Sequence, residues 1–256
     1  MINIYGDSYA DPDRKDQTTQ WQGLVKQFED INVISSGGES TYNLLRELQA
    51  NLPKENDKII FLLTDRTRLP FSFTDKPTHS AAAYDMYRAY KSHELGTGDN
   101  IDDFCKGAET GEGYEIGGSV YNNLDTVVGI YDSFAPEIKM WPFYTCLFLK
   151  WLNKKTLVLT TEKNVFKDVP YDWSTLNDSN FKIVDTQLRE VCGNEFHDGI
   201  IRAEIEHTRQ NHLSYPNHVT LYNIISNFFL GTKLSEDFHE NLYHIEGEEI
   251  KEFIYD

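Results

Sequence analysis

The stretch Lys58-Ile59-Ile60-Phe61-Leu62-Leu63 decides the fold of this 256-residue chain. Its last five residues are all apolar, and no polar residue alternates with them. A continuous apolar run of this length is typical of a strand that is buried on both faces, as in a parallel sheet covered by helices. The run therefore predicts a buried strand of an α/β domain.

The residues before this run alternate between two kinds of element. Ile2–Tyr5 and Ile31–Ile34 predict short strands, whereas Trp21–Phe28 and Ser40–Leu52 place apolar residues at helical spacing. Together with the run at 58–63 they form a β-α-β-α-β pattern. This order implies parallel strands that are joined by helices.

The regular pattern resumes later in the chain. Residues 138–152 and 216–229 predict two more helices, and residues 156–160 and 181–184 predict two more strands. The predicted fold class is therefore α/β, a three-layer α/β/α arrangement of the flavodoxin-like kind. Its central sheet has five mostly parallel strands, and the short fifth strand is expected at an edge.

Two segments depart from this regularity. Periodicity fades at about residues 70–135, where glycines cluster, which predicts an irregular insertion or cap after the third strand. The acidic tail at about residues 235–256 predicts a solvated extension. We expect a single domain over residues 1–256 that carries these two additions.

Composition narrows the function classes. The net charge of −17 argues against binding to nucleic acid or to an anionic membrane surface. The three cysteines lie far apart, without the spacing of a metal site or a disulfide framework. No apolar run reaches the roughly 18 residues that span a bilayer, and no signal peptide is visible. We therefore expect a cytoplasmic protein, or one made in a cytoplasm and carried on a particle.

A polar block follows the first predicted strand, at Tyr5-Gly6-Asp7-Ser8. Gly6 allows a tight turn, and Asp7 can hold the loop by bonding nearby backbone groups. Ser8 offers a hydroxyl that can act as a nucleophile if a base reaches it. Ligands of open α/β sheets bind at this carboxyl edge, although the triplet alone also fits an ordinary turn.

Three further blocks are placed at the same edge or beside the last helix. The segment 35–41 contains Gly37 and Gly38 and can point backbone N–H groups at an oxyanion. The segment 64–68 adds threonine and arginine side chains, and the segment 211–218 adds two histidines before the last helix. Each block by itself also fits a turn, a solvated charge cluster or an exposed histidine.

Together the four blocks, spread over the whole chain, resemble the SGNH/GDSL hydrolase family, with Gly-Asp-Ser near the start and His-Leu-Ser near the end. The resemblance implies that Ser8 is the nucleophile and His212 the general base. It implies acyl transfer to water through an acyl-enzyme, without a metal or a cofactor. The N–H groups of Ser8 and of Gly38, or of Gly37 in a shifted register, would form the oxyanion hole with a third-block side chain.

Two positions depart from the family pattern. Thr64 stands where the family has an asparagine in the oxyanion hole, and Arg68 or Arg66 can supply a positive field there. Arg209 stands where the family has the aspartate that orients the histidine. Either Glu206 or another carboxylate replaces that aspartate, or a Ser-His dyad works with a backbone carbonyl that holds the histidine.

The resemblance implies an esterase for a small acyl ester, and an O-acetylated carbohydrate is the expected substrate. Tyrosines of the insertion can line a sugar cleft, namely Tyr84, Tyr87, Tyr90, Tyr114 and Tyr121. One alternative is a non-catalytic module of the same fold that binds a glycan or a protein. Another is a nucleotide-binding domain with residues 35–41 as phosphate loop, which the acidic charge and the lack of a Gly-x-x-x-x-Gly-Lys motif disfavour.

Overall fold

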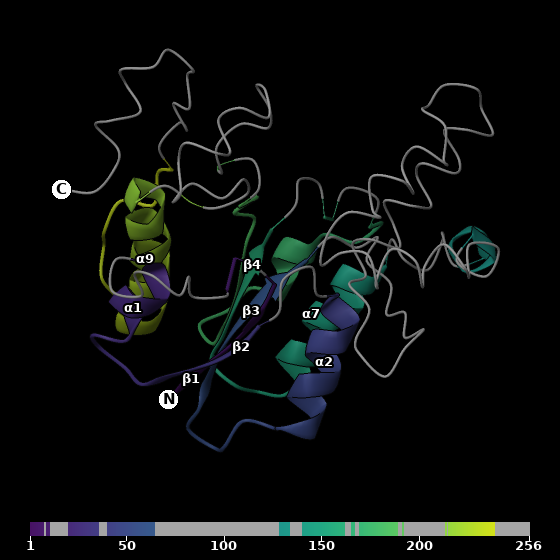
Figure 1. Cartoon of the computed structure of the whole chain (residues 1–256), viewed down its shortest axis with the longest axis horizontal. Coiled ribbons are helices and arrows are strands. Elements are labelled where there is room, and N and C mark those ends of the chain that lie inside the picture. The colour runs from purple at the N-terminus through teal and green to yellow at the C-terminus, as the bar shows by residue number, and fades with distance from the viewer. Residues whose placement is uncertain are drawn as a thin grey trace, which may run out of the picture.

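Figure 1 shows a computed structural model of the chain, in which a sheet lies between two layers of helices. The structure describes residues 1–7, 9–10, 20–35, 40–64, 128–133, 140–161, 165–166, 169–188, 191, 213 and 215–238. Most of the expected insertion and of the acidic tail lies outside the described residues. The described residues form the α/β fold that the sequence predicts.

The sheet has five strands in the order β2-β1-β3-β4-β5. Every pairing in it is parallel, so the sheet is wholly rather than mostly parallel. The short β5 lies at an edge, as predicted, and β3 at the centre. The strands are β1 (Ile2–Gly6), β2 (Ile31–Ser35), β3 (Lys58–Leu63), β4 (Thr156–Thr160) and β5 (Phe181–Val184).

Helices cover both faces of this sheet. In Figure 1, α1 and α9 lie on one side and α2 and α7 on the other. A short 3-10 helix, η1, precedes β5, and residues 128–133 are also helical. The helices are α1 (Trp21–Val25), α2 (Thr41–Ala50), α7 (Trp141–Trp151), η1 (Trp173–Leu176) and α9 (Tyr215–Leu230).

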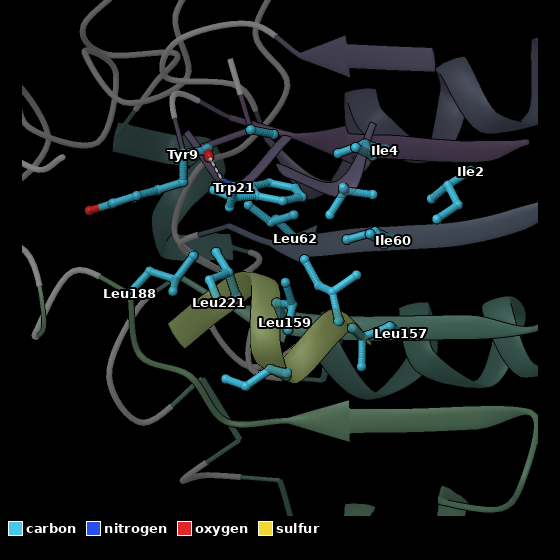
Figure 2. Close-up of a cluster of buried hydrophobic side chains, with 14 of the residues drawn as sticks. Ile2, Ile4, Tyr9, Trp21, Ile60, Leu62, Leu157, Leu159, Leu188 and Leu221 are labelled. Atoms are coloured by element: carbon cyan, nitrogen blue, oxygen red, sulfur yellow. Dashed lines mark hydrogen bonds between the residues drawn. The ribbon is translucent and has the colours of Figure 1, made fainter. Parts of the chain in front are cut away.

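The apolar run of β3 divides between two hydrophobic cores. Ile60 and Leu62 belong to the core under α1 and α9, which Figure 2 shows. Ile59, Phe61 and Leu63 belong to the core under α2 and α7. Side chains of a strand alternate between its faces, so a strand with a core on each side must be apolar throughout. Each of these side chains contributes about 1.5–3 kcal/mol by its burial.

Local signals account for the ends of two helices. The Ser40 hydroxyl accepts a hydrogen bond from the Asn43 N–H, so Ser40 caps α2 at the start of the predicted helix. The helix α1 ends at Val25, three residues before the predicted end. Beyond it the chain continues in tight turns, and Phe28 still packs on the core. The apolar spacing thus predicted the buried face correctly but not the helix length.

The residues after α9 run back along that helix (Figure 1). Asn227 holds them, because its amide donates to the Leu234 carbonyl and accepts from the Leu234 N–H, each across 2.8 Å. Asn223 donates to the Ser235 carbonyl, and Thr220 to the Asp237 carbonyl. The first residues of the acidic extension are therefore fixed to the helix by backbone contacts rather than free in solvent.

Candidate active site

The strand order places the topological switch point of the sheet between β1 and β3. In a 2-1-3-4-5 sheet the connections turn in opposite directions from these two strands, and ligands bind outside their carboxyl ends. The parallel register pairs Tyr5 with Phe61, so β1 and β3 end side by side. The residues that follow them, Asp7 and Thr64, are therefore the described polar groups at this point.

The Gly-Asp-Ser turn is built around Asp7, which is fully buried. Its carboxylate accepts the Tyr9 N–H across 3.2 Å, and its carbonyl accepts the Ala10 N–H across 2.9 Å. This confirms the prediction that Asp7 holds the loop. Ser8 itself lies outside the described residues, but the residues on both sides of it are anchored.

Gly6 is required by the close approach of Ala10. A Cβ atom at position 6 would lie 2.5 Å from the Ala10 Cβ and 3.2 Å from the Leu62 Cβ. The first distance is too short for two carbon atoms, so a side chain at Gly6 would push the turn away from the sheet. The close packing of Ala10 and Leu62 thus explains why the first residue of the Gly-Asp-Ser triplet is a glycine in this fold.

Two adjacent side chains of α1 hold the backbone that follows Ser8. The Trp21 Nε1–H donates to the Tyr9 carbonyl across 3.0 Å, as Figure 2 shows. The Gln22 amide donates to the Tyr9 carbonyl across 3.3 Å and to the Ala10 carbonyl across 3.0 Å. Buried carbonyls need such donors, so these two side chains of α1 hold the turn in place, and we call α1 the clamp helix.

The histidine block contributes one described imidazole, that of His218 on α9. Its Nδ1 accepts the Trp21 N–H across 3.4 Å, at the start of α1, where no side chain of the preceding Gln20 caps the helix. His218 therefore links α9 to the clamp helix. The predicted base, His212, lies outside the described residues, but the next residue, Leu213, is buried in the same core as Tyr9 and Ala10.

Thr64 is the one predicted site residue that the structure describes. It is 1% exposed and follows β3 directly. Its N–H donates to the Thr41 Oγ1 across 3.2 Å, and the two hydroxyl oxygens lie 3.1 Å apart. If Thr41 donates in the hydroxyl pair, the Thr64 hydroxyl keeps its own hydrogen for an acceptor at the sheet edge.

The other predicted site residues are not described by the structure. Gly38 and its alternative Gly37, Arg68 and its alternative Arg66, and Glu206 and Arg209 lie outside the described residues, as do Ser8 and His212. Of their sequence neighbours the structure describes Asp7, Tyr9, Ser40 and Leu213, and it places Tyr9 and Leu213 in one hydrophobic core.

Sequence reasoning missed a second polar network at the carboxyl ends of β4 and β5. The Thr160 hydroxyl donates to an Asp185 carboxylate oxygen across 2.7 Å and accepts the Gln187 N–H across 3.0 Å. The Thr186 hydroxyl donates to the Thr160 carbonyl across 2.7 Å. Thr160 ends one predicted strand and Asp185 follows the next, so the expectation of polar groups at the carboxyl ends of the strands applied here as well.

Other kinds of site have less support in the described part of the chain. Among the described residues, no three His, Cys, Asp or Glu side chains gather in the manner of metal ligands. The described cysteine, Cys146, is fully buried on α7, and burial raises the pKa of its thiol. No helix within the described ranges has the length and apolarity that a membrane crossing requires.

In comparisons with known proteins, no protein-family model, no curated protein and no solved structure matches the chain.

Proposed function

We propose that this chain is a serine ester hydrolase of the SGNH/GDSL type, acting through an acyl-enzyme on Ser8. One observation carries the proposal most directly. The neighbours of the predicted nucleophile, Tyr9 and Ala10, belong to the same buried core as Leu213, which follows the predicted base. Two blocks about 200 residues apart in the sequence thus contribute to one hydrophobic core, on the face of the sheet that α1 and α9 cover (Figure 1), which supports the pairing of Ser8 with His212.

The place of this region in the sheet also supports the proposal. Asp7 follows β1 and Thr64 follows β3, and the switch point between these two strands is where doubly wound sheets bind ligands. A rigid turn is what a nucleophile needs, and the Gly6-to-Ala10 turn is held by the Asp7 carboxylate and by two side chains of α1.

In the proposed reaction, the Ser8 Oγ attacks the acyl carbon while His212 takes the hydroxyl proton. The ester C–O bond breaks, His212 returns the proton to the leaving alcohol, and the acyl group stays on Ser8. Water then attacks the acyl-enzyme while His212 takes a proton from it, the bond between the acyl carbon and the Ser8 Oγ breaks, and His212 returns the proton to Ser8 as the carboxylic acid leaves. Donors from Gly38 and Thr64 stabilise the oxyanion in both steps.

We propose a small acyl ester of a carbohydrate as the substrate class. A neutral ester is not repelled by a chain with a net charge of −17, whereas an anionic ester is.

Hydrolysis of p-nitrophenyl acetate tests the proposal. We expect Ser8→Ala and His212→Gln to reduce the rate to the uncatalysed background. The matched variants are Ser235→Ala, at an exposed serine, and His218→Gln, at the histidine that contacts Trp21. Once folding is checked, Ser235→Ala should keep the wild-type rate, and His218→Gln, which alters only a support of the turn, should keep most of it. A wild-type rate equal to that of Ser8→Ala would instead favour a non-catalytic module of this fold.

A further inference from the structure

Aromatic side chains gather at the beginning of α7. Its first turn carries Trp141, Phe143 and Tyr144. The ring of Tyr42, on the first turn of α2, lies 5.6 Å from the Trp141 ring at an angle of 73°. The Phe143 ring stacks on the Tyr171 ring at 5.1 Å. The cluster thus joins two helices and the segment that leads to η1.

Three of these rings remain open to solvent. Tyr42 is 37% exposed, Tyr144 is 56% exposed and Tyr171 is 57% exposed. The edge-to-face contact between Tyr42 and Trp141 leaves ring faces that the partner does not cover. We call Tyr42, Trp141 and Tyr144 the aromatic platform, because Tyr42 contacts Trp141 and because Trp141 and Tyr144, three residues apart on α7, share a face of that helix. It combines apolar ring faces with phenol groups that can donate and accept hydrogen bonds.

The aromatic platform lies at the same edge of the sheet as the candidate site. Tyr42 follows Thr41, whose hydroxyl contacts Thr64 at the end of β3. The helix α7 ends just before β4 begins, so its first turn lies toward the carboxyl ends of the strands. The contact between Tyr42 and Trp141 confirms that both helices begin on this side.

Charge narrows what the platform can bind. Neither α2 nor α7 has an acidic residue in its first turn, so no carboxylate of these turns lies beside the rings to attract a cation. The chain as a whole carries −17, which repels nucleotides and other phosphate ligands. A sugar ring fits better, because it is neutral, its C–H faces pack on aromatic rings, and its hydroxyls bond phenols.

We propose that the aromatic platform binds a neutral sugar ring of the substrate, next to the ester that Ser8 cleaves. The choice of an acylated sugar rests on the proposed function, but sugar binding itself does not require that Ser8 reacts. The tyrosines of the insertion, which the sequence also suggests for a sugar cleft, lie outside the described residues.

The test measures binding of neutral oligosaccharides by calorimetry, with glucose, xylose, mannose and N-acetylglucosamine oligomers in O-acetylated and deacetylated form. The full-length Ser8→Ala protein serves as background, so that no probe is consumed. We expect at least one probe to bind, and Tyr42→Ala or Trp141→Ala to weaken it about fivefold to tenfold, as for one lost aromatic contact. Tyr42→Phe should restore most of the affinity, because it keeps the ring.

A matched control comes from the far end of the same helix. Trp151 is 77% exposed on α7 but lies outside the aromatic platform, so Trp151→Ala should leave binding unchanged. The inference is wrong if no probe binds, or if Trp151→Ala weakens binding as much as Tyr42→Ala does. Binding without any ester hydrolysis by the wild type would overturn the proposed function alone, whereas hydrolysis without sugar binding would overturn the platform alone.

Discussion

The indole N–H of Trp21 donates a hydrogen bond to the carbonyl of Tyr9 across 3.0 Å. This contact ties α1 to the residue that follows Ser8, and the Gln22 amide adds two bonds to the same backbone. Because α1 in turn receives a contact from His218 on α9, the turn that carries the proposed nucleophile is supported by both helices of one layer. The geometry of this turn is therefore set by residues that are remote from it in the sequence.

We expect Gln22→Leu to destabilise the fold by about 1–3 kcal/mol, because it removes two donors from buried carbonyls. Gln22→Glu should cost more, since a carboxylate faces these carbonyls without a hydrogen to donate. Urea unfolding measures both effects. Gln27→Leu, at an exposed glutamine just beyond α1, is the matched control and should be nearly neutral. Equal changes in the free energy of unfolding at positions 22 and 27 would show that the hydrogen bonds of Gln22 do not stabilise the fold.

Gly6→Ala should both destabilise the protein and slow acyl transfer, because the new Cβ meets the Ala10 Cβ at 2.5 Å. The double variant Gly6→Ala/Ala10→Gly removes the Ala10 Cβ, which the new side chain would contact. It should recover part of the stability and of the rate, with a remainder that reflects the 3.2 Å contact to Leu62. Thermal unfolding and p-nitrophenyl acetate hydrolysis measure the two quantities. The absence of any rescue by Ala10→Gly would locate the effect of Gly6 elsewhere.

Variants of Thr64 and of Thr41 distinguish a catalytic role of Thr64 from a structural one. Thr64→Val removes the proposed oxyanion donor and should lower kcat by about 10²–10³, the usual effect of one lost donor. Thr41→Val removes the acceptor of the Thr64 N–H and should destabilise the fold by about 1–3 kcal/mol. Its effect on kcat should be much smaller than that of Thr64→Val. Equal, small effects of both variants on kcat would assign Thr64 a structural role only.

The ion pair between Glu29 and Lys58 makes stability depend on pH. Partial burial opposes ionisation of Glu29, but hydrogen bonds and charge from Lys58 and from the terminal ammonium outweigh it and lower the carboxyl pKa below its ordinary value of 4.5. A lowered pKa in the folded state gives stability that is fully present above pH 4.5 and is lost as the pH falls through the folded-state value.

Urea unfolding at pH 6 and at pH 3 tests this dependence. Glu29→Gln should be less stable than the wild type at pH 6, and the difference should shrink at pH 3, where the Glu29 carboxyl becomes protonated. A constant difference at both pH values would mean that the charge of Glu29 does not stabilise the fold.

The sheet was predictable because its signals are local. The bounds of β3, β4 and β5 match the predicted segments. The end of β3 is sharp because its apolar run, buried on both faces, stops at Thr64. The end of α1 was not predictable in this way. The apolar spacing continues to Phe28, and a tight turn places Phe28 on the core as well as another helical turn would.

The contacts of the candidate site were harder to predict, because they join distant residues. The sequence indicated that Asp7 would hold its own loop, which is a contact over two residues. It did not indicate that Trp21 and Gln22 reach Tyr9, or that His218 contacts α1 across 197 positions. Such pairs depend on how the helices pack on the sheet, and no local pattern encodes that packing.

Covalent labelling of the full-length protein by a fluorophosphonate probe tests the central claim most directly. The probe forms a bond from phosphorus to the oxygen of an activated serine and expels fluoride, so peptide mass spectrometry locates the reacting residue. We predict that the mass increase maps to Ser8 and disappears in His212→Gln but persists in His218→Gln. A folded wild-type protein that carries no label, or carries it at another serine, would contradict the account.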